Sequence, residues 1–263
     1  KENIWPEGKT PDLQQEQCVP YIEWHIPANL TTKAIQIVYS GGAYYGNNPD
    51  DFEVAPIRRY LNEKGMAVVT LKYRTPRPAG NLAKHTTAWQ DLQRTIKIVR
   101  SQALAKGLDP DRIGIMGSSA GGHLTLMGVT SFRHQSYWPI DEIDRISCKV
   151  QWGVGIYPAY VLSDGFDGEN SEGGNSDRHF IAPEFSFDLD TAPMVFIHGD
   201  ADGYSAMGSV KVWEKMAMMG IQSDLHTLAT RYHCFHRQAS PGTGSYTFMD
   251  RIWEFLTAKG FNR

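Results

Sequence analysis

The chain has 263 residues, of which 41% are hydrophobic and 21% charged, so it can bury one large core. Its formal net charge of -3 gives no electrostatic footprint for nucleic acid or an anionic membrane, and no apolar run approaches the roughly 20 residues of a membrane span. Its three cysteines are too few and too scattered for a metal site. We therefore expect a single domain over residues 1–263, with no metal, no cofactor, and no nucleic-acid or membrane partner.

The first predicted strand is the apolar run 34–39, which ends in the tetrapeptide Ser40-Gly41-Gly42-Ala43. Two consecutive glycines let backbone N–H groups approach a ligand closely, although the tetrapeptide alone is a weak turn signal. Two tyrosines, Tyr44 and Tyr45, follow directly. This segment predicts a strand that leads into a loop bordered by aromatic rings.

A second apolar run, residues 65–71, is typical of a central parallel strand. Residues 87–105 have the period and composition of a helix. On this helix, Asp91 and Arg94 either order the following turn from beneath or form a solvated surface pair. The alternation of strand and helix predicts an α/β fold with a mostly parallel central sheet and helices on both faces.

The most informative motif is Gly117-Ser118-Ser119-Ala120-Gly121, which lies between an apolar strand, 112–116, and a small-residue helix start, 122–126. A G-x-S-x-G sequence between a strand and a helix is typical of a nucleophile elbow. The sharp turn strains its central residue, so glycines are needed on both sides. The motif predicts that Ser119 is the nucleophile and that the amide of Ala120 donates to the oxyanion of a tetrahedral intermediate.

Residues 150–156 form a further predicted buried strand. The region 157–190 is rich in Gly, Asp, Asn, Ser and Phe without sustained periodicity, so we expect a cap-like loop region there, with an open polar stretch from Asp164 to Asp177. Next, the predicted strand 193–197 ends in a loop that carries two candidate acids, Asp200 and Asp202.

Residues 223–228 alternate as a strand should, and the loop after them carries His233 and His236 before a terminal helix at 246–256. A serine hydroxyl is a poor nucleophile until a base takes its proton, and we expect this loop to supply the base. The order serine, acid, histidine along the chain is the one found in folds with a nucleophile elbow.

At these residues the chain resembles carbohydrate acyl esterases of the α/β-hydrolase superfamily, and among them bacterial acetyl xylan esterases and feruloyl esterases. The family's His-Gly-x-x-Asp pattern falls on His198, Gly199 and Asp202, which implies that Asp202 is the acid and that His198 orders its loop. The family's base usually precedes Gly-Phe. Here His233 precedes Cys234-Phe235, so the resemblance implies His233 as the base and leaves His236 as a competitor.

The resemblance also concerns the oxyanion loop and the substrate. Related enzymes carry His-Gly-Gly-Gly where this chain has Ser-Gly-Gly-Ala, so an amide of Gly41, Gly42 or Ala43 would be the second oxyanion donor. Aromatic rings near the predicted loops could stack on the apolar faces of sugars. The candidates are Tyr44, Tyr45, Tyr157 and Tyr204.

These features predict a serine carboxylesterase that removes small acyl groups, acetyl first, from plant cell-wall carbohydrate through an acyl-enzyme. The nearest alternative is a feruloyl or general short-chain carboxylesterase. A peptidase of the prolyl oligopeptidase type usually carries a large extra domain, and a non-catalytic binding protein usually loses triad residues, so both are weaker alternatives. The start at Lys1 suggests a trimmed or processed start. The sequence shows no export signal, but a removed one would fit a polysaccharide esterase, and we expect a secreted or periplasmic protein whose partner is an ester of a small molecule, oligosaccharide or polysaccharide.

Overall fold

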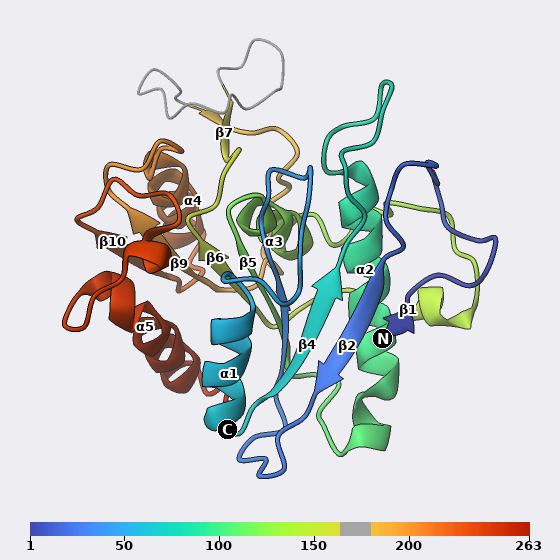
Figure 1. The fold of residues 1–263 in the computed structure, drawn as a ribbon, viewed down its shortest axis with the longest axis horizontal. Helices are drawn as coiled ribbons and strands as arrows, with labels where there is room; N and C mark the ends of the chain where they lie inside the picture. The colour runs from blue at the N-terminus through green and yellow to red at the C-terminus, as the bar shows by residue number, and fades with distance from the viewer. Residues whose placement is uncertain (164–179) are drawn as a thin grey trace.

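The computed structural model describes residues 1–163 and 180–263, built around one eight-stranded sheet (Figure 1). The strand order is β1-β2-β4-β3-β5-β6-β9-β10. Neighbours from β4 to β10 pair in parallel, whereas β2 is antiparallel to β1 and β4. The strands are β1 Glu2–Asn3, β2 Tyr21–His25, β3 Ile35–Tyr39, β4 Ala67–Lys72, β5 Ile113–Ser118, β6 Trp152–Ile156, β9 Met194–Gly199 and β10 Asp224–Leu228. The predicted mostly parallel sheet is confirmed.

Helices cover both faces of this sheet, as predicted (Figure 1). Side chains of α2, α3 and α4 belong to one hydrophobic cluster, and those of α1 and α5 belong to a second cluster on the opposite face. The α-helices are α1 Ala55–Glu63, α2 Thr86–Ala103, α3 Ala120–Thr130, α4 Met207–Met218 and α5 Gly244–Ala258. Short 3-10 turns lie at Leu104–Lys106, Glu142–Arg145 and Phe235–Gln238.

Strand β3 shows why the central strands are apolar throughout. Successive side chains point to opposite faces of a sheet. Ile37 accordingly packs in the cluster that contains Leu124 of α3, whereas its neighbour Val38 packs in the cluster that contains Leu61 of α1. Because both faces are covered, every residue of β3 is buried.

On helix α2, Asp91 and Arg94 are both buried and bind different partners, so the alternative of a solvated surface pair is wrong. The carboxylate of Asp91 accepts hydrogen bonds from the backbone N–H and the guanidinium of Arg74, which follows β4. Arg94 instead binds the carboxylates of Asp141 and Asp144. Asp91 thus ties α2 to the end of β4, and Arg94 ties it to the segment before β6.

Several elements were not predicted, namely β1, β2, α1, α4 and the antiparallel pair β7 Leu162–Ser163 and β8 Phe180–Ile181. The pair lies within the region expected to form a cap, while the polar stretch from Asp164 to Asp177 lies outside the described residues. Among residues 1–163 and 180–263, no helix has the length and apolar character needed to cross a bilayer. The carboxyl ends of β3, β5, β9 and β10 lie at one edge of the sheet, the upper edge in Figure 1.

Candidate active site

Ser119 occupies a strained turn between β5 and α3. Its backbone angles are φ 55° and ψ -119°, in a region that non-glycine residues rarely adopt. The Ser119 N–H donates to the carbonyl of Ile156 (2.9 Å), and its carbonyl accepts from the N–H of Ala159 (3.0 Å). A Cβ atom on Gly117 would lie 2.2 Å from the carbonyl oxygen of Gly121, so the turn excludes a larger residue there. These contacts hold Ser119 in place at the carboxyl end of β5.

Ser119, His233 and Asp202 form a continuous hydrogen-bonded chain. His233 Nε2 lies 2.7 Å from Ser119 Oγ, and His233 Nδ1 lies 2.8 Å from Asp202 Oδ2. A carboxylate only accepts hydrogen bonds, so Nδ1–H donates to Asp202 and leaves Nε2 free to accept the serine hydroxyl. This geometry allows the imidazole to take the proton of Ser119 during attack on an acyl carbon.

The loop after β9 holds Asp202 as an anion. The N–H of Tyr204 donates to Asp202 Oδ1 (2.8 Å), and His198 Nε2 lies 3.4 Å from Oδ2. Burial by itself would raise the pKa of Asp202, but the hydrogen bonds from His198 and His233 outweigh it and lower the pKa to about 2. His198 also donates to the carbonyl of Tyr204 and accepts from Ser209 Oγ, so it orders the loop as well as the carboxylate.

The two competing side chains lie in other contacts. Asp200 Oδ1 accepts from the N–H of Thr230 (3.0 Å) and so connects the loops after β9 and β10. His236 stacks on Tyr157, with ring centroids 5.6 Å apart, and its Nδ1 lies 3.1 Å from the Tyr157 hydroxyl. Burial lowers the pKa of His236 to about 4. Of the candidates left open by the sequence, Asp202 and His233 are the ones brought to Ser119.

The loop after β3 packs directly against the serine. Three of its residues have left-handed backbone angles, namely Gly42 (φ 83°), Ala43 (φ 53°) and Tyr44 (φ 63°). The N–H of Gly41 donates to Glu53 Oε2 at 2.7 Å, so Gly41 is removed from the expected oxyanion donors. In the part of the chain that the structure describes, the amides of Gly42, Ala43 and Ala120 have no hydrogen-bond acceptor.

Glu53 is a buried carboxylate beneath this loop that sequence reasoning missed. Besides Gly41, it binds the hydroxyl of Tyr157, which donates to Oε1 at 2.8 Å. Burial raises its pKa, although both hydrogen bonds oppose the shift. The surrounding sequence, Asp50-Asp51-Phe52-Glu53, is that of an exposed polar loop, so composition gave no signal of a buried acid.

Arg77 holds the same loop from the side of β4 and was also missed. Its Nε donates to the carbonyl of Ala43 (2.9 Å), and its Nη2 donates to the Tyr160 hydroxyl (2.9 Å). The guanidinium carbon lies 4.3 Å from the ring centroid of Tyr45. Arg77 therefore connects three aromatic or backbone groups beside the serine.

Two of the four tyrosines proposed for the substrate are buried in the protein. Tyr44 is only 1% exposed and its hydroxyl binds His123 Nδ1, while Tyr157 is fully buried against Glu53 and His236. Neither presents a ring face to solvent, so both are corrected to packing residues. Tyr45 is 61% exposed, and Tyr204 is partly exposed with its ring centroid 4.5 Å from that of His233.

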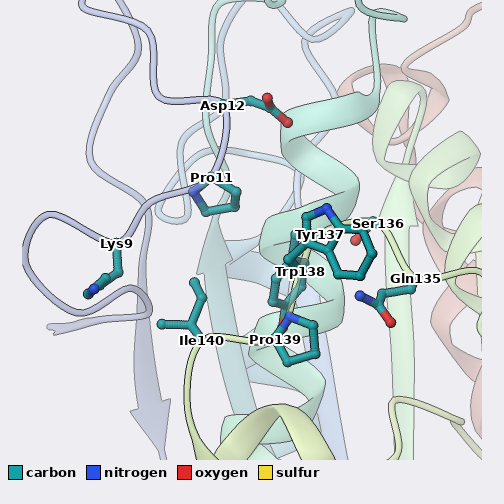
Figure 2. A pocket seen from close by; sticks show the side chains of 9 residues that line it. All are labelled: Lys9, Pro11, Asp12, Gln135, Ser136, Tyr137, Trp138, Pro139 and Ile140. Carbon is teal, nitrogen blue, oxygen red and sulfur yellow. The ribbon is translucent and has the colours of Figure 1, made fainter.

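A separate cavity of about 890 Å³ lies between residues 9–12 and residues 135–140 (Figure 2). Trp138, which is 86% exposed, stands at this cavity. Ser119, His233 and Asp202 are not among its lining residues. The hydrogen-bonded chain at the sheet edge is therefore a distinct feature of the molecule.

Two curated relatives match part of the chain. An acetylxylan esterase of Xylanibacter ruminicola is 32% identical over 101 residues, which make up 38% of this chain and 19% of that protein. LipM of Mycobacterium tuberculosis, a probable carboxylic ester hydrolase, is 31% identical over 140 residues, or 52% of this chain and 31% of that protein. The matched part spans less than a third of either relative.

Solved structures match over nearly the whole chain and show the fold. An acetyl ester-xyloside bifunctional hydrolase from Caldicellulosiruptor lactoaceticus has a TM-score of 0.81 at 22% identity, covering 100% of this chain and 97% of that one. The apo form of Thermogutta terrifontis esterase 2 has a TM-score of 0.72 at 23% identity, covering 94% and 92%. The architecture is thus the α/β-hydrolase fold. The sequence profile of the family described as BD-FAE matches residues 23–159, just over half of the 263 residues, and the chain belongs to that family.

Proposed function

We propose that this protein is a serine carboxylesterase that removes acetyl groups from plant cell-wall carbohydrate. The observation that carries the proposal is the chain Ser119–His233–Asp202, with distances of 2.7 and 2.8 Å, beside backbone amides that have no acceptor among the described residues. Acyl transfer requires an activated serine and N–H donors that are free to bind the oxyanion.

The reaction has two halves. Ser119 Oγ attacks the ester carbonyl carbon while His233 Nε2 takes the hydroxyl proton, and Asp202 stabilises the imidazolium that forms. The C–O bond to the sugar then breaks, and the sugar oxygen leaves with that proton from His233. In the second half, a water molecule takes the place of the sugar hydroxyl. It attacks the acetyl-serine with His233 as base, releasing acetate and restoring Ser119.

Negative charge develops on the carbonyl oxygen in both halves. The amide of Ala120 lies directly after the nucleophile, and those of Gly42 and Ala43 lie in the facing loop. Gly41 is excluded because its N–H is bound by Glu53. We assign the oxyanion contacts to Ala120 together with Gly42 or Ala43, an arrangement in which each donor typically contributes about 10²- to 10³-fold in rate.

Membership of the BD-FAE family and the partial match to an acetylxylan esterase support carbohydrate as the alcohol side of the ester. Tyr45, which is exposed next to the loop after β3, and Tyr204, which is partly exposed against His233, are the proposed sugar contacts. A polysaccharide substrate lies outside the cell, so the proposal includes export to the periplasm or medium, which cell fractionation with an antibody against this chain would test.

The deciding experiment compares acetate release from acetylated xylan with ferulate release from methyl ferulate. We expect acetate release as the faster reaction, with p-nitrophenyl palmitate hydrolysed slowly or not at all. If ferulate is released faster than acetate, the proposed specificity changes from acetyl to feruloyl esters. Hydrolysis of palmitate esters without acetate release from any acetylated glycan would rule the proposal out.

The matched control for the nucleophile is its neighbour. Ser119→Ala should abolish turnover because no other hydroxyl contacts His233 Nε2 among the described residues. Ser118→Ala should keep most of the activity, since Ser118 is a buried residue of β5 whose hydroxyl makes no hydrogen bond to His233 or Asp202 among the described residues. Activity that survives in Ser119→Ala and is lost in Ser118→Ala would contradict the assignment.

A further inference from the structure

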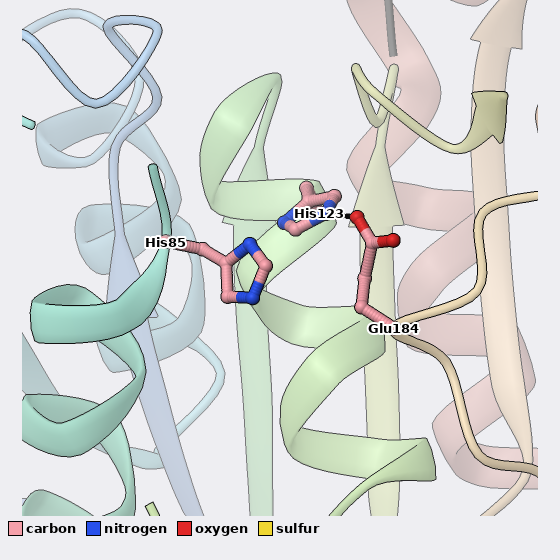
Figure 3. A group of neighbouring side chains, drawn as sticks. All are labelled: His85, His123 and Glu184. Carbon is pink, nitrogen blue, oxygen red and sulfur yellow. Dashed lines mark hydrogen bonds and ion pairs between the residues drawn. The ribbon is translucent and has the colours of Figure 1, made fainter. Parts of the chain in front are cut away.

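A second cluster of chemically capable side chains lies beside the oxyanion loop and outside the proposed triad. His85 caps the start of α2, His123 lies on the first turn of α3, and Glu184 lies between β8 and β9. One ligand atom from each residue falls within 4.8 Å of the others (Figure 3). The three residues are far apart in the sequence, so no spacing motif indicated them.

We propose that His85, His123 and Glu184 bind a divalent transition-metal ion, with Zn²⁺ as the best fit. Two imidazoles and one carboxylate form a ligand set that zinc uses in proteins, with a fourth position left for water. Tetrahedral zinc with ligands at about 2.0–2.1 Å places its donor atoms roughly 3.4 Å apart. Donors already within 4.8 Å need side-chain shifts on the order of 1 Å to reach that spacing.

The unsatisfied nitrogen of His85 points to a ligand at this place. His85 is 9% exposed, and its Nδ1 is buried without a hydrogen-bond partner among the described residues. Its ring presents a nitrogen toward the imidazole of His123 (Figure 3). A buried nitrogen without a partner costs roughly 1–3 kcal/mol, and a coordinate bond to a metal would remove that cost.

His123 is already oriented as metal-binding histidines are. Its Nε2 lies 2.9 Å from Glu184 Oε1, and its Nδ1 lies 2.7 Å from the hydroxyl of Tyr44. Nε2–H donates to the carboxylate, and Nδ1 accepts from Tyr44. With a metal on Nε2, the proton moves to Nδ1 and donates to the tyrosine oxygen, so the same contact fixes the ring in both forms.

The protonation states suit a cation. Burial lowers the pKa of His85 to about 3 and lowers the pKa of His123, so both imidazoles are neutral and keep a lone pair. The hydrogen bond from His123 holds the pKa of Glu184 near 2 against the effect of burial, so Glu184 is an anion. The nearby ammonium of Lys84 opposes a second cation, which favours a moderate affinity.

A metal here would connect the start of α2, helix α3 and the segment before β9. Tyr44 transmits the link to the oxyanion loop, because it belongs to that loop and binds His123. The bound ion should therefore stabilise the folded protein and leave the chemistry of the proposed triad in place.

The test uses the full chain after treatment with a chelator. Zn²⁺ affinity is measured by competition with a chromophoric chelator, and Co²⁺ is added to record the visible spectrum of a four-coordinate site. We expect one ion per chain and a rise in melting temperature of about 5 °C or more at a hundredfold excess over Kd. His85→Ala should weaken binding by about 10- to 100-fold or more, and Glu184→Gln, which keeps an oxygen acceptor for His123, should weaken it similarly.

Two further variants are controls for place and fold. His226→Ala removes a histidine of β10 outside the cluster, and His233→Ala removes the histidine of the proposed triad, so both should bind the ion as wild type does. X-ray absorption spectroscopy of the zinc-loaded wild type should show two imidazole ligands. This measurement does not depend on whether a variant folds. The proposal is overturned if wild type binds no ion, if His85→Ala and Glu184→Gln bind it unchanged, or if His233→Ala abolishes binding.

Discussion

At the scale of single residues, the site depends on Ser119 being held before any substrate arrives. A residue at φ 55° costs free energy, and the hydrogen bonds to Ile156 and Ala159 on either side of it maintain that conformation. The histidine is equally restrained, because Asp202 holds one ring nitrogen and Ser119 the other. The proposed proton transfer would then require little reorganisation of these side chains, which is how fixed dipoles lower an activation barrier.

Asp202→Asn should reduce kcat by about 10³- to 10⁴-fold, because an amide in place of the carboxylate favours the wrong histidine tautomer. Asp200→Asn is the matched control and should have a small effect, since Asp200 binds the N–H of Thr230 and not the histidine. Steady-state kinetics with p-nitrophenyl acetate measures both. A larger loss in Asp200→Asn than in Asp202→Asn would contradict the assigned acid.

Glu53→Ala should lower kcat by about 10- to 100-fold with little change in KM, because the loop that presents the oxyanion amides would lose its anchor at Gly41. Glu53→Gln keeps an oxygen acceptor and should recover most of the rate. Glu63→Gln, on an exposed residue of α1, serves as the control. Equal kinetics in Glu53→Ala and wild type would show that the loop keeps its shape without the carboxylate.

At the scale of elements, the connection between β4 and α2 is an unusually buried ion pair. Arg74 and Asp91 have fully buried side chains 2.9 Å apart, and Asp91 also accepts from the indole N–H of Trp5. Removing one partner leaves an uncompensated charge in a low-dielectric environment, which costs far more than losing a surface pair.

Asp91→Ala should therefore lower the free energy of unfolding by about 3–5 kcal/mol. Glu142→Ala breaks the ion pair between Glu142 and Arg145, whose side chains are 79% and 77% exposed respectively. This variant should lower the free energy of unfolding by less than about 1 kcal/mol. Chemical denaturation followed by circular dichroism gives both values. Similar losses in the two variants would contradict the difference attributed to burial.

Whether an element could be predicted depends on how much of its surface is buried. The strands β3, β4, β5, β6 and β9 are covered on both faces and appear in the sequence as continuous apolar runs. Strand β2, which lies between the two-residue edge strand β1 and β4, is only partly buried, and its residues, Tyr-Ile-Glu-Trp-His, form no such run. Helix α1 is nine residues long with no side-chain cap, so its local start signal is limited to Pro56 in the first turn.

The site shows the same limit. The elbow could be read from the chain because its glycines are required locally, as the close approach of Gly117 to Gly121 shows. Glu53 and Arg77 act through contacts with loops distant in sequence, and one sequence carries no record of such contacts. Tyr44 and Tyr157 were assigned to the substrate because they lie near the predicted loops in the chain. The assignment was wrong because proximity in the chain does not reveal which way a ring points.

At the scale of the whole molecule, two hydrophobic layers enclose the sheet and leave the functional loops at one edge. The α2–α3–α4 layer and the α1–α5 layer bury the strands from opposite sides (Figure 1). Loops at the carboxyl ends of the strands then converge without taking part in the core, which is the usual place for ligand sites in open α/β sheets.

Acid should reveal the contribution of Asp202 to global stability. Its folded pKa of about 2 lies below the ordinary aspartate pKa of 3.8, so its stabilising effect is complete above the unfolded pKa and is lost as the pH falls through the folded one. The free energy of unfolding of wild type should thus fall more between pH 4 and about 2 than that of Asp202→Asn, and urea titrations across this range test it. Parallel curves for the two proteins would contradict an ionised Asp202.

The most direct test of the central claim, that His233 and Asp202 activate Ser119 for acyl transfer, is the site of a covalent label. The protein is treated with a serine-directed p-nitrophenyl phosphonate, and the adduct is located by peptide mass spectrometry while release of p-nitrophenol gives the rate. We expect one adduct per chain on Ser119, formed orders of magnitude more slowly in His233→Ala than in His236→Ala. An adduct on Ser118, or an equal rate in the two histidine variants, would contradict the account.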